Sequence, residues 1–108
     1  MKKVLDVSDA NFDNEVKRST IPVLVDFYAT WCGPCRQLSP IIEDLAIEYE
    51  NKIRIIKVNI DESPIKTNEY NIQTVPSLML FTNGELKESF IQARQKSELK
   101  NILDKYVS

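Results

Sequence analysis

The chain contains the stretch Val25-Asp26-Phe27-Tyr28-Ala29-Thr30-Trp31-Cys32-Gly33-Pro34-Cys35, in which a mostly apolar run leads into two cysteines three positions apart. The run spans Pro22–Ala29 and is typical of a strand that is buried on both faces. After the cysteines, apolar residues recur at the spacing of an amphipathic helix: Leu38, Ile41, Ile42, Leu45, Ala46 and Tyr49. The stretch therefore predicts a C-x-x-C pair where a strand passes into a long helix, a pattern typical of redox chemistry.

Shorter elements are predicted on both sides of this strand and helix. On the N-terminal side, a strand near Lys3–Asp6 precedes a helix over Asp9–Arg18 that Ser8 can cap. On the C-terminal side, the predicted elements are a strand over Ile53–Ile60, a short helix starting at Ser63-Pro64 and ending near Tyr70, strands over Ser77–Thr82 and Leu86–Ile91, and a last helix with Leu99, Ile102, Leu103 and Tyr106 on one face. Asn83-Gly84 predicts a tight hairpin, so the last two strands should be antiparallel.

The predicted order of elements is β-α-β-α-β-α-β-β-α. This order is typical of an α/β protein with a single mixed sheet of about five strands and helices on both faces. No internal repeat or Pro/Gly/Ser-rich linker divides the sequence, so we expect one domain over residues 1–108.

Composition argues against several classes of partner. The net charge is −2 and no run of like charges occurs, which excludes the usual footprint of a protein that binds nucleic acid or anionic membranes. Asp6 interrupts the apolar residues near the N-terminus, and Asp26 interrupts the apolar stretch Ile21–Ala29. We therefore expect a soluble, unexported protein of the cytoplasm, with an organelle stroma or matrix as the alternative if a targeting segment has been removed.

The two cysteines are better suited to chemistry than to structural support. A disulfide between Cys32 and Cys35 would close almost no loop and so would add little stability. At the start of a helix, the sulfur of Cys32 would lie near the N–H of Cys35 and the positive end of the helix dipole, which should lower the pKa of Cys32. We expect Cys35, one turn further in, to be less exposed and less acidic. Cys32 should then attack a substrate disulfide and Cys35 should resolve the mixed disulfide.

Two other interpretations of the cysteine pair fit the sequence less well. A structural zinc site needs four ligands, and the chain has no histidine and no further cysteine, so only a dimer sharing two pairs could build one. Two inert core cysteines fit poorly with Gly33-Pro34 between them, because Gly33 would let another chain approach and Pro34 would stiffen the first helical turn. We expect no metal and no bound cofactor.

The motif around Trp31-Cys32-Gly33-Pro34-Cys35, together with Pro40 and Val75-Pro76-Ser77, resembles the thioredoxin family across essentially the whole chain. The resemblance implies the thioredoxin fold and a general protein-disulfide reductase that acts on disulfide-containing proteins. It also implies a monomer that is reduced by a thioredoxin reductase, usually one that uses NADPH and flavin, with a ferredoxin-linked enzyme as the organelle alternative.

The resemblance also implies a role for two charged residues. Asp26 stands among apolar neighbours, so we expect it to be buried with a raised pKa, although an exposed strand position was the alternative. In the family, the aspartate at this place lies beneath the disulfide and is thought to deprotonate the second cysteine, here Cys35. Lys57 resembles the family lysine near that aspartate, although an ordinary surface lysine fits the pattern equally well.

Further family positions form the expected docking surface. Pro76 resembles the family's cis-proline, which presents the residue before it, here Val75, for main-chain pairing with substrate. Trp31 should flank the site as a partly exposed aromatic residue, with ordinary core packing as the alternative. Gln92 replaces the family glycine after the last strand, and we expect it to alter which partners dock.

Two milder departures from the family pattern concern single side chains. Tyr28 replaces the usual tryptophan, and Asn71 stands where glycine is common but can also adopt a positive φ.

Two other functions are alternatives to disulfide reduction. Oxidases and isomerases of the family tend to place a histidine between the cysteines, whereas this chain has Gly33-Pro34 and no histidine, so reduction is favoured. A non-catalytic binding module with the same fold would not need Cys32 or Cys35, so their replacement separates it from an enzyme.

Overall fold

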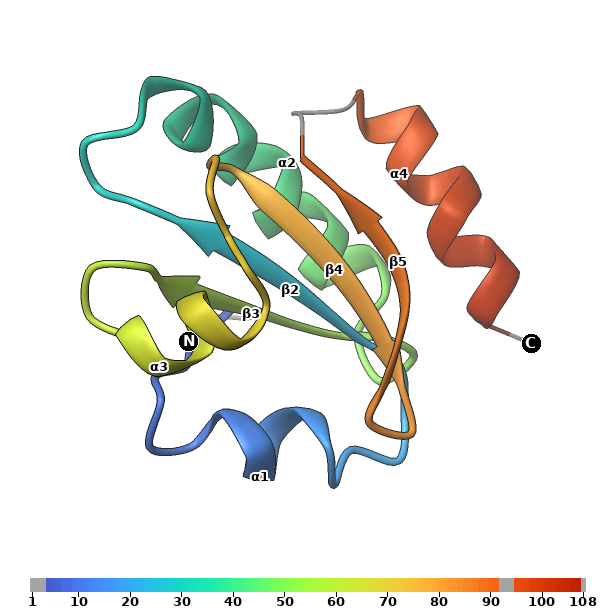
Figure 1. The fold of residues 1–108 in the computed structure, drawn as a ribbon. Helices are drawn as coiled ribbons and strands as arrows, with labels where there is room; N and C mark the ends of the chain where they lie inside the picture. The colour runs from blue at the N-terminus through green and yellow to red at the C-terminus, as the bar shows by residue number, and fades with distance from the viewer. Residues whose placement is uncertain (1–3, 92–94, 108) are drawn as a thin grey trace.

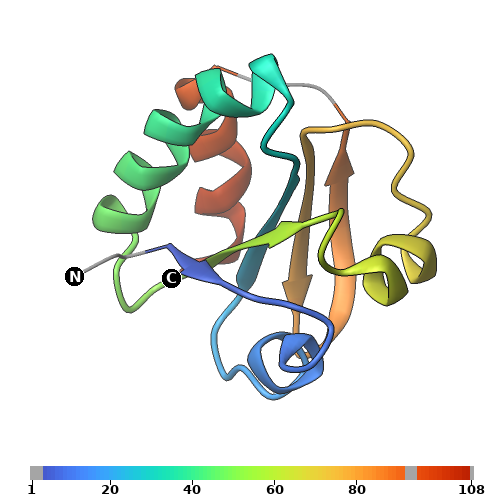
Figure 2. The same ribbon diagram turned by 90° about the vertical axis from the view of Figure 1, so that its left-hand side faces the viewer.

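The computed structural model describes residues 4–91 and 95–107, and within them a five-stranded sheet is covered by helices on both faces (Figures 1 and 2). The elements are β1 (Leu5–Asp6), α1 (Phe12–Val16), β2 (Val23–Tyr28), α2 (Gly33–Glu48), β3 (Arg54–Asn59), α3 (Pro64–Glu69), β4 (Ser77–Thr82), β5 (Glu85–Phe90), α4 (Lys96–Leu103) and a 3-10 turn, η1 (Asp104–Tyr106). The predicted order of strands and helices is confirmed, with ends that differ by a few residues.

The sheet has the strand order β1-β3-β2-β4-β5, so β2 lies at its centre. Strand β2 runs parallel to β3 and antiparallel to β4, and β1 runs parallel to β3 at the edge. The predicted hairpin joins β4 to β5, with positive φ angles of 51° at Asn83 and 81° at Gly84. Asn71 also has a positive φ of 55°, as expected.

The alternating side chains of β2 serve two separate cores. Leu24 packs on the face covered by α2 and α4, with Leu38 and Leu99 among its neighbours. Val25 and Phe27 pack on the opposite face, in a cluster that also holds Phe12 and Val16 from α1. Figure 2 shows the two helix layers on either side of the sheet. Because both faces are covered, Val23–Phe27 is buried without interruption, which places Asp26 inside the protein.

Two helices are capped differently from what the residues at their starts, Ser8 and Ser63, would suggest. Helix α1 begins at Phe12 with Asn11 as its N-cap residue, and the backbone N–H of Ser8 donates to Oδ1 of Asn11 at 2.8 Å. Ser63 does precede α3, but its hydroxyl makes no capping bond. The carboxylate of Asp9 instead accepts from the backbone N–H groups of Ile65 and Lys66 at 3.0 and 2.9 Å. A charged acceptor from the N-terminal segment thus takes the place of the local hydroxyl.

Candidate active site

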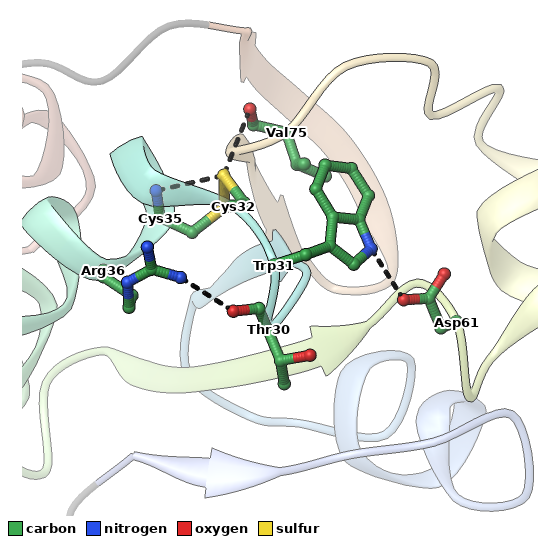
Figure 3. Close-up of a disulfide and its surroundings, with 7 residues drawn as sticks. All are labelled: Thr30, Trp31, Cys32, Cys35, Arg36, Asp61 and Val75. Atoms are coloured by element: carbon green, nitrogen blue, oxygen red, sulfur yellow. Dashed lines mark hydrogen bonds between the residues drawn. A yellow bond between two sulfur atoms is a disulfide. The ribbon is translucent and has the colours of Figure 1, made fainter.

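Cys32 is the N-cap residue of α2, and its Sγ accepts a hydrogen bond from the backbone N–H of Cys35 at 3.1 Å. The two side chains form a disulfide across a Cα–Cα distance of 5.3 Å (Figure 3). Pro34 lies in the first turn of α2, where its missing N–H leaves no helical hydrogen bond unmade. The predicted capping geometry is therefore confirmed, and it directs helix-end N–H groups at the Cys32 sulfur.

The expected difference in exposure between the cysteines is wrong for this disulfide form. Cys32 is 4% exposed and Cys35 is 6% exposed, so both are buried. The cover over Cys32 comes from a distant part of the chain, because Val75 packs against the cluster of Ala29, Cys32 and Cys35. The position at the helix end, rather than exposure, distinguishes the two cysteines here.

The loop before β4 brings main-chain groups to the disulfide. The Val75–Pro76 bond is cis, as the family resemblance implies, and Pro76 is buried. The carbonyl oxygen of Val75 lies 3.6 Å from Sγ of Cys32 (Figure 3). An extended segment carrying a substrate disulfide would meet this backbone beside the sulfur.

Trp31 is 66% exposed beside the disulfide, which excludes ordinary core packing. Its indole Nε1–H donates to Oδ2 of Asp61 at 2.9 Å, and Figure 3 shows the ring lying between the Val75 loop and Asp61. On the other side, the guanidinium of Arg36 donates to the carbonyl oxygen of Thr30 at 2.9 Å. Asp61 was not identified from the sequence. The sequence indicated only that it follows β3 closely, at the end of the sheet where the parallel strand β2 also ends.

Glycine between the cysteines is not required by packing within the chain. A Cβ at Gly33 would meet only the guanidinium of Arg36, at 3.9 Å, among the described residues. The close approach of another chain, which glycine at position 33 would allow, therefore stays an expectation. Gln92 lies outside the described residues, so its placement at the docking surface also stays an expectation.

Asp26 is buried in β2 and is 5% exposed. It lines a cavity of about 310 Å³ together with Cys35, Arg36 and Lys57. Its Oδ1 has no hydrogen-bond partner within the part of the chain that the structure describes. Burial raises the pKa of Asp26 to about 7, and the positive charge of Lys57 opposes the rise. The burial expected from the sequence is confirmed, and the carboxyl shares its cavity with the second cysteine.

Lys57 is the register partner of Asp26 on the adjacent strand β3. Its side chain is 24% exposed. This exposure lies between that of a lysine enclosed beside Asp26 and that of an ordinary surface lysine, the two alternatives that the sequence left open. The ammonium forms an ion pair with Asp6 at 3.8 Å and lies 5.4 Å from the centre of the Tyr28 ring. Lys57 therefore contacts Asp6 on β1 and Tyr28 on β2, the strand that also carries Asp26.

Comparison with known proteins agrees with this geometry. The family model described as Thioredoxin matches residues 3–105. The chain is 47% identical to a thioredoxin of Pyropia yezoensis over 105 residues, 97% of this chain and 98% of that protein. It is 45% identical to a thioredoxin of Rickettsia prowazekii over 104 residues, 96% of this chain and 99% of that protein.

The similarity extends to a plastid relative. A protein of Spinacia oleracea named "Thioredoxin M-type, chloroplastic" is 46% identical over 108 residues, all of this chain and 60% of its own length. The chain belongs to the thioredoxin family. It has the thioredoxin fold, and it is a protein-disulfide oxidoreductase that works as a reductase through a reversible Cys32–Cys35 dithiol.

No helix within residues 4–91 and 95–107 is long and apolar enough to cross a membrane. The same residues hold no group of three or more His, Cys, Asp or Glu side chains placed to bind a metal.

Proposed function

We propose that Cys32 is the attacking thiol and Cys35 the resolving thiol in the reduction of protein disulfides. The observation that carries this assignment is the hydrogen bond from the N–H of Cys35 to Sγ of Cys32 at the first turn of α2. An N–H group and the positive end of a helix both favour thiolate over thiol, so this position would favour the Cys32 thiolate in the reduced protein.

The reaction takes place in two exchanges. In the first, the Cys32 thiolate attacks one sulfur of the substrate disulfide, forms a mixed disulfide and expels the other substrate sulfur as a thiolate, which takes up a proton. In the second, Cys35 loses its proton and attacks Sγ of Cys32. This step re-forms the Cys32–Cys35 disulfide and releases the second substrate thiol, so the substrate gains the two electrons that the protein loses.

Asp26 is the proposed acceptor for the proton of Cys35. It shares a cavity with Cys35, and its buried Oδ1 has no partner among the described residues. A carboxyl with a pKa of about 7 is close to the ambient pH, so it can take up and return a proton in each cycle. Lys57 would act on this step through its charge, as the register partner of Asp26 on β3.

Substrate docking is proposed on the surface around the disulfide. The carbonyl of Val75, fixed by cis-Pro76, would pair with the substrate main chain, while Trp31 would cover one side. Gly33 and Pro34 would form the base of this surface at the start of α2. Gln92 lies outside the described residues, and we assign it to docking only from its sequence position after β5 and the family resemblance.

The experiment is a trapping assay with an insulin-derived disulfide peptide. We expect Cys35→Ser to accumulate a mixed disulfide through Cys32, seen as a mass increase that dithiothreitol removes. Cys32→Ser should trap nothing and should lose insulin reduction, which also separates the enzyme from a non-catalytic binding module. If Cys32→Ser traps the peptide instead, the two roles are reversed. If both variants keep the wild-type rate, the dithiol is dispensable for the reaction.

For the cell, we propose that a thioredoxin reductase using NADPH and flavin regenerates the dithiol. The protein would act as a monomeric electron carrier of the cytoplasm that maintains cellular redox balance. A coupled assay tests the donor, in which NADPH oxidation should depend on this chain, on the reductase and on a disulfide substrate. Reduction only by a ferredoxin-linked reductase would contradict the proposal and favour the plastid-type donor.

A further inference from the structure

Three charged side chains form a row across the parallel half of the sheet. Asp6 on β1 is the register partner of Lys57 on β3, and Lys57 is the register partner of Asp26 on β2. Neighbours in register point to the same face, here the face covered by α2. One cation therefore stands between two carboxylates, with Asp6 at the solvent end of the row and Asp26 at the buried end.

Lys57 forms an ion pair with Asp6, at the solvent end of the row, and packs against the ring of Tyr28 from β2. Its Nζ lies 3.8 Å from Oδ1 of Asp6 and 5.4 Å from the centre of the Tyr28 ring. The hydroxyl of Tyr28 donates to the same Oδ1 at 3.4 Å. Tyr28 therefore both covers the ammonium with its ring and holds the carboxylate that pairs with it.

The position of the three groups in two hollows supports the same arrangement. Asp26 and Lys57 line the 310 Å³ cavity that reaches Cys35. Asp6 lines a second, more open hollow of about 490 Å³. Tyr28 lines both and so stands between them. A small movement of the flexible Lys57 side chain would change which carboxylate it neutralises.

We propose that Asp6 is a positioning residue that, together with Tyr28, holds the Lys57 ammonium at the outer end of the row and so limits its pairing with Asp26. The inference rests on the proposed role of Asp26 as proton acceptor for Cys35. A cation drawn away from Asp26 leaves the ionised form of that carboxyl poorly compensated, which keeps the proton on Asp26 until the pH approaches neutrality.

Other charged or titratable groups lie near Asp26 or at the outer end of the row. Helix α2 contributes Cys35 and Arg36 to the cavity, and the guanidinium of Arg36 is held by the carbonyl of Thr30. Strand β4 contributes the apolar Leu78 as the register partner of Asp26. On the solvent side, Glu62 lines the second hollow with Asp6. Among these groups, Lys57 is the cation that adjoins Asp26 in register and also has a second carboxylate to pair with.

The test measures the protonation of Asp26 directly, by carbon-13 NMR of its side-chain carboxyl in the full-length disulfide form, where the cysteines do not titrate. In Asp6→Asn, Lys57 is released toward Asp26, and we expect the Asp26 titration midpoint to fall by about half a pH unit, the size of effect typical of a partly exposed ion pair. Asp6→Glu should restore the wild-type midpoint. Asp44→Asn is the matched control, because Asp44 is also an exposed, ion-paired aspartate but lies on α2 beside Lys96.

A Lys57→Met background separates the positioning of Lys57 from a direct effect of the Asp6 charge on Asp26. In Lys57→Met, the further change Asp6→Asn should move the Asp26 midpoint by less than a third of its effect in wild type. Tyr28→Phe should give a smaller fall than Asp6→Asn, because it keeps the ring over Lys57 and removes only the hydroxyl. An unchanged midpoint in both Asp6→Asn and Tyr28→Phe would overturn the proposal, and so would an equal fall with and without Lys57.

Kinetics distinguish this inference from the proposed function. The pH profile for resolution of the mixed disulfide should move to lower pH in Asp6→Asn, in step with the Asp26 midpoint. If the midpoint moves and the resolution profile does not, Asp6 positions Lys57 as proposed, and the role of Asp26 as proton acceptor is wrong. If the midpoint does not move while Asp26→Asn still slows resolution, the proton acceptor stands and the positioning role is wrong.

Discussion

Asp9 caps α3 at Lys66 through a contact that spans 57 positions of the sequence. Its two carboxylate oxygens accept one N–H each, from Ile65 and from Lys66, at the first turn of the helix. Helix α3 is only six residues long and is followed by the loop that carries Val75 and Pro76. The start of the chain is therefore tied to the segment that leads to the active site.

We expect Asp9→Ala to destabilise the protein by about 1–2 kcal/mol, the usual cost of losing a helix cap. Ser63→Ala is the control at the conventional cap position. The buried Ser63 hydroxyl makes no hydrogen bond among the described residues, so its removal should cost no stability. Urea unfolding followed by circular dichroism measures both. A larger loss from Ser63→Ala than from Asp9→Ala would reverse the assignment of the cap.

Asp26→Asn should stabilise the folded protein at neutral pH. The folded-state pKa of about 7 lies above the ordinary aspartate value of 3.8, so the native state binds this proton more tightly than the unfolded chain. The associated stability is fully present below the unfolded value and is lost as the pH rises through the folded value. The difference amounts to at most about 4 kcal/mol, and water reaching the cavity should reduce it to about 2–3 kcal/mol.

The measurement for Asp26 is the free energy of unfolding between pH 4 and pH 8. The gain from Asp26→Asn over wild type should be small near pH 4 and should reach its maximum above pH 7. A gain that is equal at both ends of this range would show that the substitution acts through packing rather than through ionisation of the carboxyl.

Asp61 should affect substrate binding through Trp31. The bond from the indole to Asp61 holds an exposed ring beside the disulfide, and its loss is worth about 0.5–1.5 kcal/mol. We expect Asp61→Ala to raise KM for a protein disulfide about two- to five-fold with kcat nearly unchanged. Asp61→Asn keeps an acceptor oxygen and should stay near wild type. A fall in kcat with constant KM would instead place Asp61 in the chemical step.

Gln92 should affect the choice of partner. A glutamine adds a polar amide that a docked partner must hydrogen-bond or desolvate, at a cost on the order of 1–3 kcal/mol when it is unmet. We expect Gln92→Gly to raise kcat/KM with a foreign thioredoxin reductase, and to leave it unchanged or lower with the native one. Equal kcat/KM values for wild type and Gln92→Gly in every pairing would mean that the side chain takes no part in docking.

Local sequence signals predicted most of the architecture. The buried strand, the C-x-x-C junction and the Asn83-Gly84 turn each depend on neighbouring residues, so their consequences follow without knowledge of the fold. The burial of Asp26 followed in the same way from its apolar neighbours in β2.

The missed features join residues that are distant in sequence. The Asp9 cap, the bond between Trp31 and Asp61 and the pairing of Asp6 with Lys57 all depend on which loop or strand lies alongside. Each depends on an exposed polar side chain. Such side chains do not contribute to the periodic spacing of apolar residues from which the helices and strands were predicted. The burial of Cys32 was missed for a similar reason, because its cover is Val75, 43 positions later.

The location of the single tryptophan has a practical consequence for spectroscopy. Trp31 is outside both hydrophobic cores and adjoins the disulfide, and a disulfide quenches the emission of a nearby indole. Intrinsic tryptophan fluorescence should therefore report the redox state of the cysteines and the binding of partners rather than the packing of the core. An unfolding curve recorded by this signal would follow the active-site edge, and it would coincide with a circular dichroism curve only if that edge opens together with the rest of the sheet.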